Sequence, residues 1–80
     1  MGGESAALKL HQKYLKKQER LQKHPESGFP EPLLSDRKIL YRASIINKYY
    51  KIIYYVKGNT LRIAAFWDMR INPNKLEKRI

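Results

Sequence analysis

A tyrosine-rich pattern near the C-terminus limits the possible folds of this chain more than any other feature. Two apolar runs, 49–57 and 60–67, stand on either side of Gly58 and Asn59. Such runs are typical of β-strands, and both turn residues tolerate the positive φ that two-residue hairpin turns require. Arg70 follows the second run and precedes a turn-forming Asn-Pro-Asn sequence. The pattern predicts a hairpin that presents an arginine from the end of a rigid sheet.

Residues 5–24 predict a long amphipathic helix. The segment has neither glycine nor proline, and Pro25 ends it because the residue before a proline is displaced from the helical region. On a helical wheel one arc is apolar and consists of Ala6, Ala7, Leu8, Leu10, Tyr14, Leu15 and Leu21. The remainder is basic and carries Lys9, Lys13, Lys16, Lys17, Arg20 and Lys23. We expect the apolar arc to pack on the sheet and the basic face to bind a partner.

The whole chain, 1–80, is expected to form a single α+β domain in which the helix packs on a three-stranded antiparallel β-meander. Residues 25–36 are expected to form a loop, whose acids Glu26, Glu31 and Asp36 have no compensating base. The sheet is expected within 38–67, and 68–80 form a tail whose end is either a helical turn or frayed.

Alternation along the hairpin assigns its side chains to two faces. The face expected to form the core consists of Tyr50, Ile52, Tyr54, Val56, Leu61, Ile63, Ala65 and Trp67. The face expected to be partly exposed consists of Lys51, Ile53, Tyr55, Arg62, Ala64 and Phe66.

The charge of the chain points to an acidic partner. Lysine and arginine number 17 against 7 acidic residues, which gives a formal net charge of +10. Nucleic acid, an acidic protein or an anionic membrane surface can each balance such a charge. Cysteine is absent, so disulfides and thiolate metal sites are excluded and a cytoplasmic location is compatible. No apolar run reaches the length of a membrane-spanning helix, and no metal site or cofactor is expected.

Four segments follow one another in an order that resembles a known family. Residues 21–28 (Leu-Gln-Lys-His-Pro-Glu-Ser-Gly) look like the end of its second helix, and residues 40–42 (Leu-Tyr-Arg) resemble its arginine-bearing strand. Residues 50–55 are similar to its central strand, and 66–73 to its closing strand and arginine turn. The family is the RelE/ParE superfamily, the toxins of bacterial type II toxin–antitoxin pairs. The likeness spans about residues 5–76.

The resemblance implies a toxin that inhibits growth by gyrase poisoning or by ribosome-dependent messenger RNA cleavage, and that a cognate acidic antitoxin neutralises. Members of the family begin with a strand and a first helix that have no counterpart in this chain. We therefore expect a truncated or degenerate member, whose toxicity is open and whose sheet has an unpaired edge through which a homodimer can form. The alternative is a small basic nucleic-acid-binding module without toxic activity.

Arg70 is the first candidate for contact with a phosphate or a macromolecular target. A guanidinium is always charged in proteins and can form bidentate hydrogen bonds with a phosphate. The resemblance implies that basic side chains on the sheet hold the scissile phosphate, and Arg62, Lys51 and Arg42 are the further candidates. For Arg70 the alternative is an ion pair with Asp68, and for the other three it is a solvated charge.

A catalytic acid and base are harder to find. His11 and His24 lie on the helix, and Tyr55 is the remaining candidate for proton transfer. Whether the protein is an enzyme therefore stays open, and the missing acid–base pair favours gyrase poisoning. Tyr49, Tyr55 and Phe66 are the aromatic residues expected to stay accessible, for example for stacking on unpaired bases.

Overall fold

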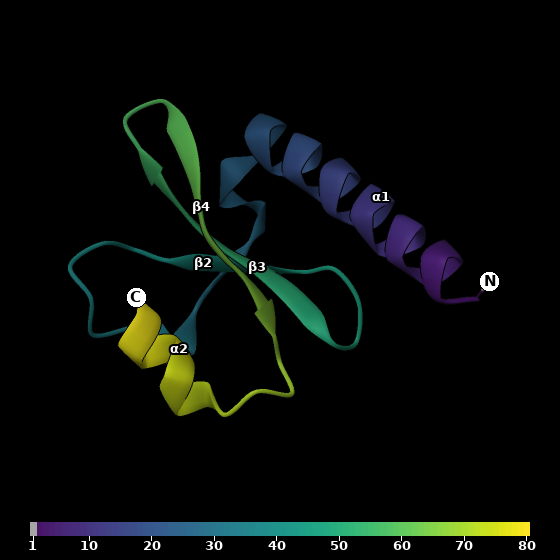
Figure 1. Ribbon diagram of the computed structural model, residues 1–80. Coiled ribbons are helices and arrows are strands. Elements are labelled where there is room, and N and C mark those ends of the chain that lie inside the picture. The colour runs from purple at the N-terminus through teal and green to yellow at the C-terminus, as the bar shows by residue number, and fades with distance from the viewer. Residues whose placement is uncertain (1) are drawn as a thin grey trace.

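The computed structural model describes residues 2–80, with the side chains of residues 5–80. Its elements, in chain order, are helix α1 (Gly2–Lys23), strands β1 (Phe29–Pro30), β2 (Arg42–Ile45), β3 (Tyr50–Lys57) and β4 (Thr60–Asp68), and helix α2 (Pro73–Arg79). Two short 3-10 helices, Pro25–Ser27 and Pro32–Leu34, flank β1. The four strands form one antiparallel sheet in the order β1-β2-β3-β4. Figure 1 shows the strongly twisted sheet between α1 and α2.

The α+β class, the long N-terminal helix and the antiparallel meander were predicted correctly. The expected three-stranded sheet is wrong, because the segment expected to be a loop contributes β1, whose Phe29 pairs with Ala43. The expected tail contains α2, which starts where the Asn72 side chain accepts a hydrogen bond from the backbone of Asn74. Among the described residues no helix could cross a membrane.

The hairpin turn forms at Gly58 and Asn59, as the sequence predicts. Gly58 has a φ of +61°, whereas Asn59 stays at negative φ. Only the first central residue of the turn therefore needs the left-handed region, which is the pattern of a type II′ turn.

A β-bulge in β4 changes which side chains share a face. Ile53 pairs with Ala65 but Tyr54 pairs with Ile63, so Ala64 has no partner on β3. Beyond the bulge, Phe66 lies opposite Ile52, whereas a ladder without the bulge would place it opposite Lys51. Our expectation that Ala65 and Trp67 belong to the face of Ile52 and Tyr54 is therefore wrong, because one extra residue in a strand reverses its alternation.

Both faces of the sheet are packed. On the α1 face the buried residues are Leu21, Ile52 and Tyr54. On the opposite face, which we call the α2 face, the buried residues are Leu34, Ala43, Ile53, Trp67 and Leu76. We expected the second face to be partly exposed. This is wrong around Lys51, which α2 and the 3-10 helix at Pro32–Leu34 cover, but it holds toward the hairpin turn, where Arg62 is exposed. The Arg37 guanidinium holds α2 there by donating to the carbonyl oxygen of Glu77, at 2.6 Å.

The apolar arc of α1 packs only in part. Leu21 is fully buried, and Leu10 and Tyr14 are half-buried along the same stripe. Leu8 and Leu15 lie to one side of it and are 62% and 48% exposed. Figure 1 shows the N-terminal end of α1 extending beyond the sheet.

Tyr54 ties the end of α1 to the sheet. Its buried hydroxyl accepts a hydrogen bond from the backbone N–H of Gly28 (3.0 Å) and donates one to the carbonyl oxygen of Pro25 (2.6 Å). A Cβ at Gly28 would collide with that hydroxyl and would lie 2.7 Å from the carbonyl oxygen of Ala43. Burial raises the pKa of the Tyr54 phenol, against the opposing effect of the Gly28 hydrogen bond.

Candidate binding surfaces

Lys51 is not an exposed cation. Its Nζ lies 2.8 Å from both carboxylate oxygens of Glu31. The side chains are only 11% and 1% exposed, so this is a buried ion pair on the α2 face. We expected Lys51 to be a target contact and Glu31 to have no compensating base, and the pairing corrects both expectations. Asp36 is likewise paired, with Arg37 at 2.9 Å.

Arg42 is also engaged within the protein. It pairs with Tyr54 across β2 and β3, which places its side chain on the α1 face. There its guanidinium donates to the carbonyl oxygen of Gly28 at 2.8 Å. Arg42 and Lys51 therefore lie on opposite faces of the sheet and cannot hold one phosphate together.

Arg62 and Tyr55 are opposite each other on β4 and β3. Arg62 shares the face of Lys51, as the alternation predicts, but the two lie about 13 Å apart along the hairpin, at the typical rise per residue. Arg62 is exposed, and the half-buried Tyr55 ring packs edge-on against Tyr41 at 5.5 Å. The four bases predicted to cluster with Tyr55 are therefore dispersed over two faces and along the whole sheet.

Arg70 forms a separate arrangement just beyond β4, which we call the arginine–tyrosine cluster (Tyr49, Tyr50, Asp68 and Arg70). Its Nε and Nη2 lie 3.0 and 2.9 Å from the two carboxylate oxygens of Asp68. Nη2 also donates to the Tyr50 hydroxyl at 3.2 Å, and the guanidinium lies 4.3 Å from the centre of the Tyr49 ring. The ion pair with Asp68 is the alternative that the sequence left open for Arg70.

This pairing shifts both groups toward their charged forms. Hydrogen bonds from Arg70 lower the pKa of the Asp68 carboxyl, and the same contact raises the pKa of the guanidinium. The Arg70 side chain is nevertheless 56% exposed, so part of its surface stays accessible. Because the carboxylate neutralises the charge locally, the cluster suits a polar or aromatic group better than an isolated phosphate.

A row of aromatic rings leads from this cluster to α1. The Phe66 ring stacks on Tyr50 with centres 5.1 Å apart, and Tyr14 of α1 meets Phe66 edge-on at 5.4 Å. Tyr49 and Phe66 are 37% and 43% exposed. Of Tyr49, Tyr55 and Phe66, which we expected to stay accessible, these two are therefore confirmed. The sequence analysis missed this row because the bulge decides the face of Phe66.

The predicted partner-binding bases of α1 are all exposed: Lys9, Lys13, Lys16, Arg20 and Lys23. None of them forms an ion pair within residues 5–80. Part of this basic face borders a hollow of about 290 Å³ beside Ile46, lined by Lys13, Lys16, Lys17 and Arg20. Like charges spaced four residues apart on a helix cost about 0.2–0.5 kcal/mol per pair, which an acidic ligand would relieve.

The titratable side chains that accept hydrogen bonds from Arg70 are Asp68 and Tyr50. His11 is exposed on α1 and lines a groove with Phe66, and His24 is exposed just after α1; neither forms a hydrogen bond to the arginine–tyrosine cluster among the described residues. Within the described residues no group of three or more histidine or acidic side chains could hold a metal ion. What the surface offers is an exposed basic helix face and an aromatic row that ends in a paired arginine.

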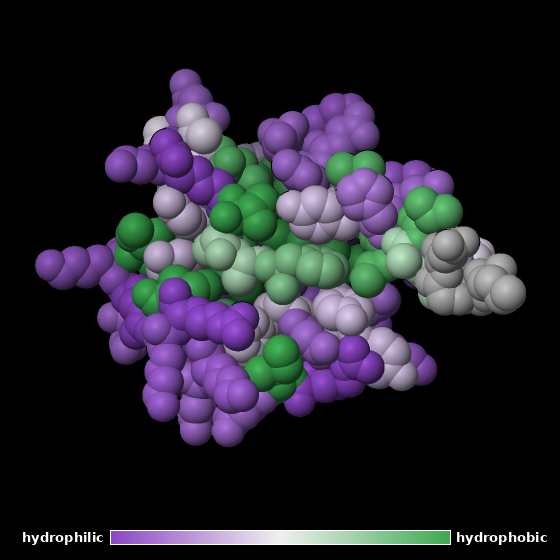
Figure 2. All heavy atoms as spheres, viewed as in Figure 1, coloured by the Kyte–Doolittle hydropathy of each residue, from purple (hydrophilic) through white to green (hydrophobic). Residues whose placement is uncertain are grey.

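Figure 2 shows that hydrophobic side chains form a band across the visible side of the molecule, between hydrophilic side chains above and below.

Comparisons of the chain with protein-family models, with curated proteins and with solved structures found no match.

Proposed function

We propose that this chain is a RelE/ParE-like toxin component that inhibits growth by binding DNA gyrase, and that a cognate acidic antitoxin neutralises it in the bacterial cytoplasm. The target comes from the resemblance of residues 5–76 to that family. The dispersal of Arg42, Lys51 and Arg62 supports binding over messenger RNA cleavage, since phosphate chemistry needs several charged groups that converge on one point.

One observation carries the proposal: α1 presents five exposed bases that form no ion pair among residues 5–80 (Lys9, Lys13, Lys16, Arg20 and Lys23). A helix face of this kind speeds association with an acidic protein and adds specificity to the complex. The basic face would serve the antitoxin, while Arg70 and its neighbouring rings would contact the target.

The test compares three activities of the purified protein. We expect inhibition of gyrase supercoiling, no cleavage of messenger RNA in the presence of ribosomes, and growth arrest on induction of the gene. Arg70→Ala should abolish growth arrest and gyrase inhibition while the circular dichroism spectrum stays unchanged. Lys75→Ala, an exposed base in α2, is the matched control. Cleavage of messenger RNA, or full toxicity of Arg70→Ala, would contradict the proposal.

A second candidate function, a small nucleic-acid-binding module, is favoured by the hollow on the basic face. Four bases around one depression can follow a phosphate backbone. This function predicts tight binding to short DNA or RNA that weakens steeply as salt increases. Triple substitution of Lys13, Lys16 and Arg20 by glutamine should remove this binding but leave gyrase inhibition intact.

A further inference from the structure

The open edge of β4 and the apolar groove beside it suggest how an acidic partner is held. We propose that an extended acidic segment of the partner adds to β4 as a fifth strand and inserts one apolar side chain into that groove. The inference rests on the proposed function in so far as the partner is the acidic antitoxin, and it states which surface that antitoxin occupies.

The first observation is the edge itself. β4 is nine residues long and pairs only with β3 among the described strands. The backbone N–H of Met69 donates to the carbonyl oxygen of Tyr49 at 2.7 Å, which fixes the phase of the antiparallel ladder. Because hydrogen-bonded pairs alternate in such a ladder, the peptide groups of Phe66 and Asp68 point away from β3. These groups can pair with an added strand.

The bulge limits where such a strand can pair. Ala64 interrupts the regular spacing of β4, and the exposed Arg62 lies beyond it toward the hairpin turn. Bulges and charged side chains both discourage pairing along an edge. The regular part from Ala65 to Asp68 is therefore the segment available to a partner.

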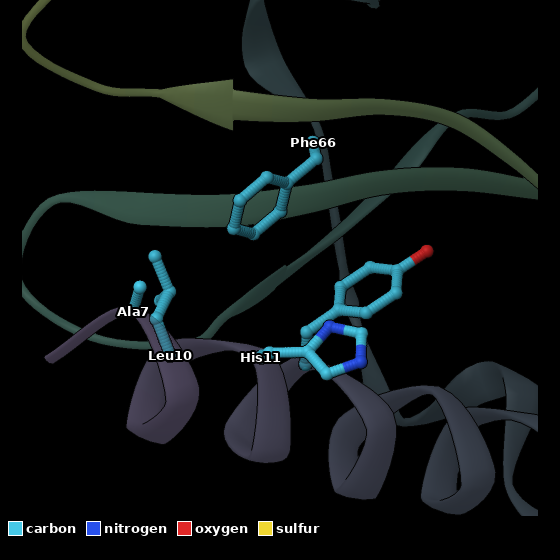
Figure 3. Close-up of a pocket in the computed structure, with 5 residues that line it drawn as sticks. Ala7, Leu10, His11 and Phe66 are labelled. Carbon is cyan, nitrogen blue, oxygen red and sulfur yellow. The ribbon is translucent and has the colours of Figure 1, made fainter. Parts of the chain in front are cut away.

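The second observation is an apolar groove of about 360 Å³ next to this segment, lined by Ala7, Leu10, His11, Tyr14 and Phe66. Figure 3 shows Phe66 extending from the sheet toward the turns of α1 that carry Ala7, Leu10 and His11. Phe66 stays 43% exposed although it contacts two other rings. In an added strand every second side chain would point to this face, so one of them can fill the groove.

Charge decides between the possible occupants. Lys9 and Lys13 flank Leu10 along α1 and are exposed without an ion-pair partner among residues 5–80. A second copy of the chain would bring a formal charge of +10 against another of +10. An acidic strand instead places carboxylates beside these lysines while its apolar residues cover Phe66. The observations therefore favour an acidic segment over a homodimer through the same edge.

The probe is a synthetic peptide of alternating glutamate and valine, matched to the nine residues of β4 and blocked at both ends. NMR spectra of the labelled protein should show that saturating peptide slows amide hydrogen exchange at Phe66 and Asp68 by at least about tenfold. A peptide with alternate amides N-methylated, which cannot pair as a strand, should bind at least about tenfold more weakly. A lysine–valine peptide should not bind.

Two matched variants test the groove. Phe66→Ala should weaken peptide binding by about tenfold or more, as expected for the loss of a central aromatic anchor. Val56→Ala should have no effect, since Val56 is also 43% exposed but lies near the hairpin turn. Should Phe66→Ala perturb folding, Lys9→Glu with Lys13→Glu replaces it and is expected to weaken binding with the fold unchanged.

Several outcomes would overturn the inference. Equal binding of the N-methylated peptide would rule out strand addition, and peptide-induced changes confined to the basic face near Lys16 and Arg20 would place the partner elsewhere. A dimer whose Phe66 and Asp68 amides are protected without peptide would assign the edge to a second copy. Gyrase inhibition is measured separately: inhibition without peptide binding at β4 rejects only this inference, and peptide binding without inhibition rejects only the proposed function.

Discussion

The two faces of the sheet are closed to different extents. On the α2 face, the buried residues extend from Leu34 to Leu76 and enclose the ion pair of Lys51 and Glu31. On the α1 face, burial is complete around Leu21 and Tyr54 but gives way to an open groove toward the N-terminal half of the helix. The comparison suggests that the α2 face mainly stabilises the fold, while the open half of the α1 face remains available for binding.

Breaking the buried ion pair should have the largest effect. Lys51→Met leaves Glu31 buried without its counter-ion, and we expect the free energy of unfolding to fall by about 3–5 kcal/mol. A domain of 80 residues has a total stability of only about 4–12 kcal/mol, so this loss would remove about a quarter of it or more. Urea denaturation followed by circular dichroism measures the change.

The double variant Lys51→Met with Glu31→Leu is the control for this prediction, since it removes both charges together. It should recover most of the lost stability. A single variant as stable as the wild type would show that the pair is hydrated and that the α2 face is less closed than its burial indicates.

Truncating two leucines of α1 should show how differently the two ends of this helix are packed against the α1 face. Leu21→Ala removes a fully buried side chain and should cost about 2–5 kcal/mol of unfolding free energy. Leu8→Ala, at a site 62% exposed, should change it by less than about 0.5 kcal/mol. Thermal denaturation of both variants tests this. If both variants lost the same free energy of unfolding, the N-terminal half of α1 would be packed in solution.

Removing the Tyr54 hydroxyl should have a smaller effect. Tyr54→Phe leaves the backbone N–H of Gly28 without its partner, at a cost of about 1–3 kcal/mol near pH 7.

The same hydroxyl predicts a dependence on pH. Because burial raises the pKa of Tyr54, its stabilising contribution is fully present below the ordinary value of 10.0 and is lost as the pH rises from there through the raised value. The stability difference between wild type and Tyr54→Phe should therefore narrow in alkaline solution. A constant difference up to pH 12 would mean that the phenol ionises equally in both states.

The smallest effect is expected at the exposed pair of Asp68 and Arg70. Arg70 lowers the pKa of Asp68, so the contribution of this carboxylate is present above its ordinary pKa of 3.8 and is lost as the pH falls through the lowered value. Asp68→Asn should be slightly less stable than wild type at pH 7, and the two should melt alike in strong acid. Raising the salt concentration should shrink the difference at pH 7, since exposed pairs are screened.

Features set by neighbouring residues were predictable from the sequence. Pro25 ends α1 within a residue of the expected place, and Gly58 forms the expected hairpin turn. The possibility that Arg70 pairs with Asp68 could also be inferred from their spacing. Phe66 is exposed as expected, but on the α1 face and not on the face that alternation gave it.

Features that depend on distant partners were not predictable. Glu31 and Lys51 are twenty residues apart, and nothing local marks them as a pair. α2 is short, and it is stabilised by the burial of Leu76 against the sheet more than by the helix preference of its own sequence. Ala64 is an ordinary strand residue, so its bulge is decided by how the side chains on both faces pack.

The unpaired Ala64 determines which residues of β3 the end of β4 faces. Losing the single codon for this alanine would join Ile63 directly to Ala65, so Phe66 could stay opposite Ile52 and Trp67 opposite Lys51 in a ladder without a bulge. If Ala64 were kept and paired with Ile53 instead, Phe66 would lie opposite Lys51 and Trp67 would leave the buried α2 face, so the bulge is what keeps both aromatic side chains in place.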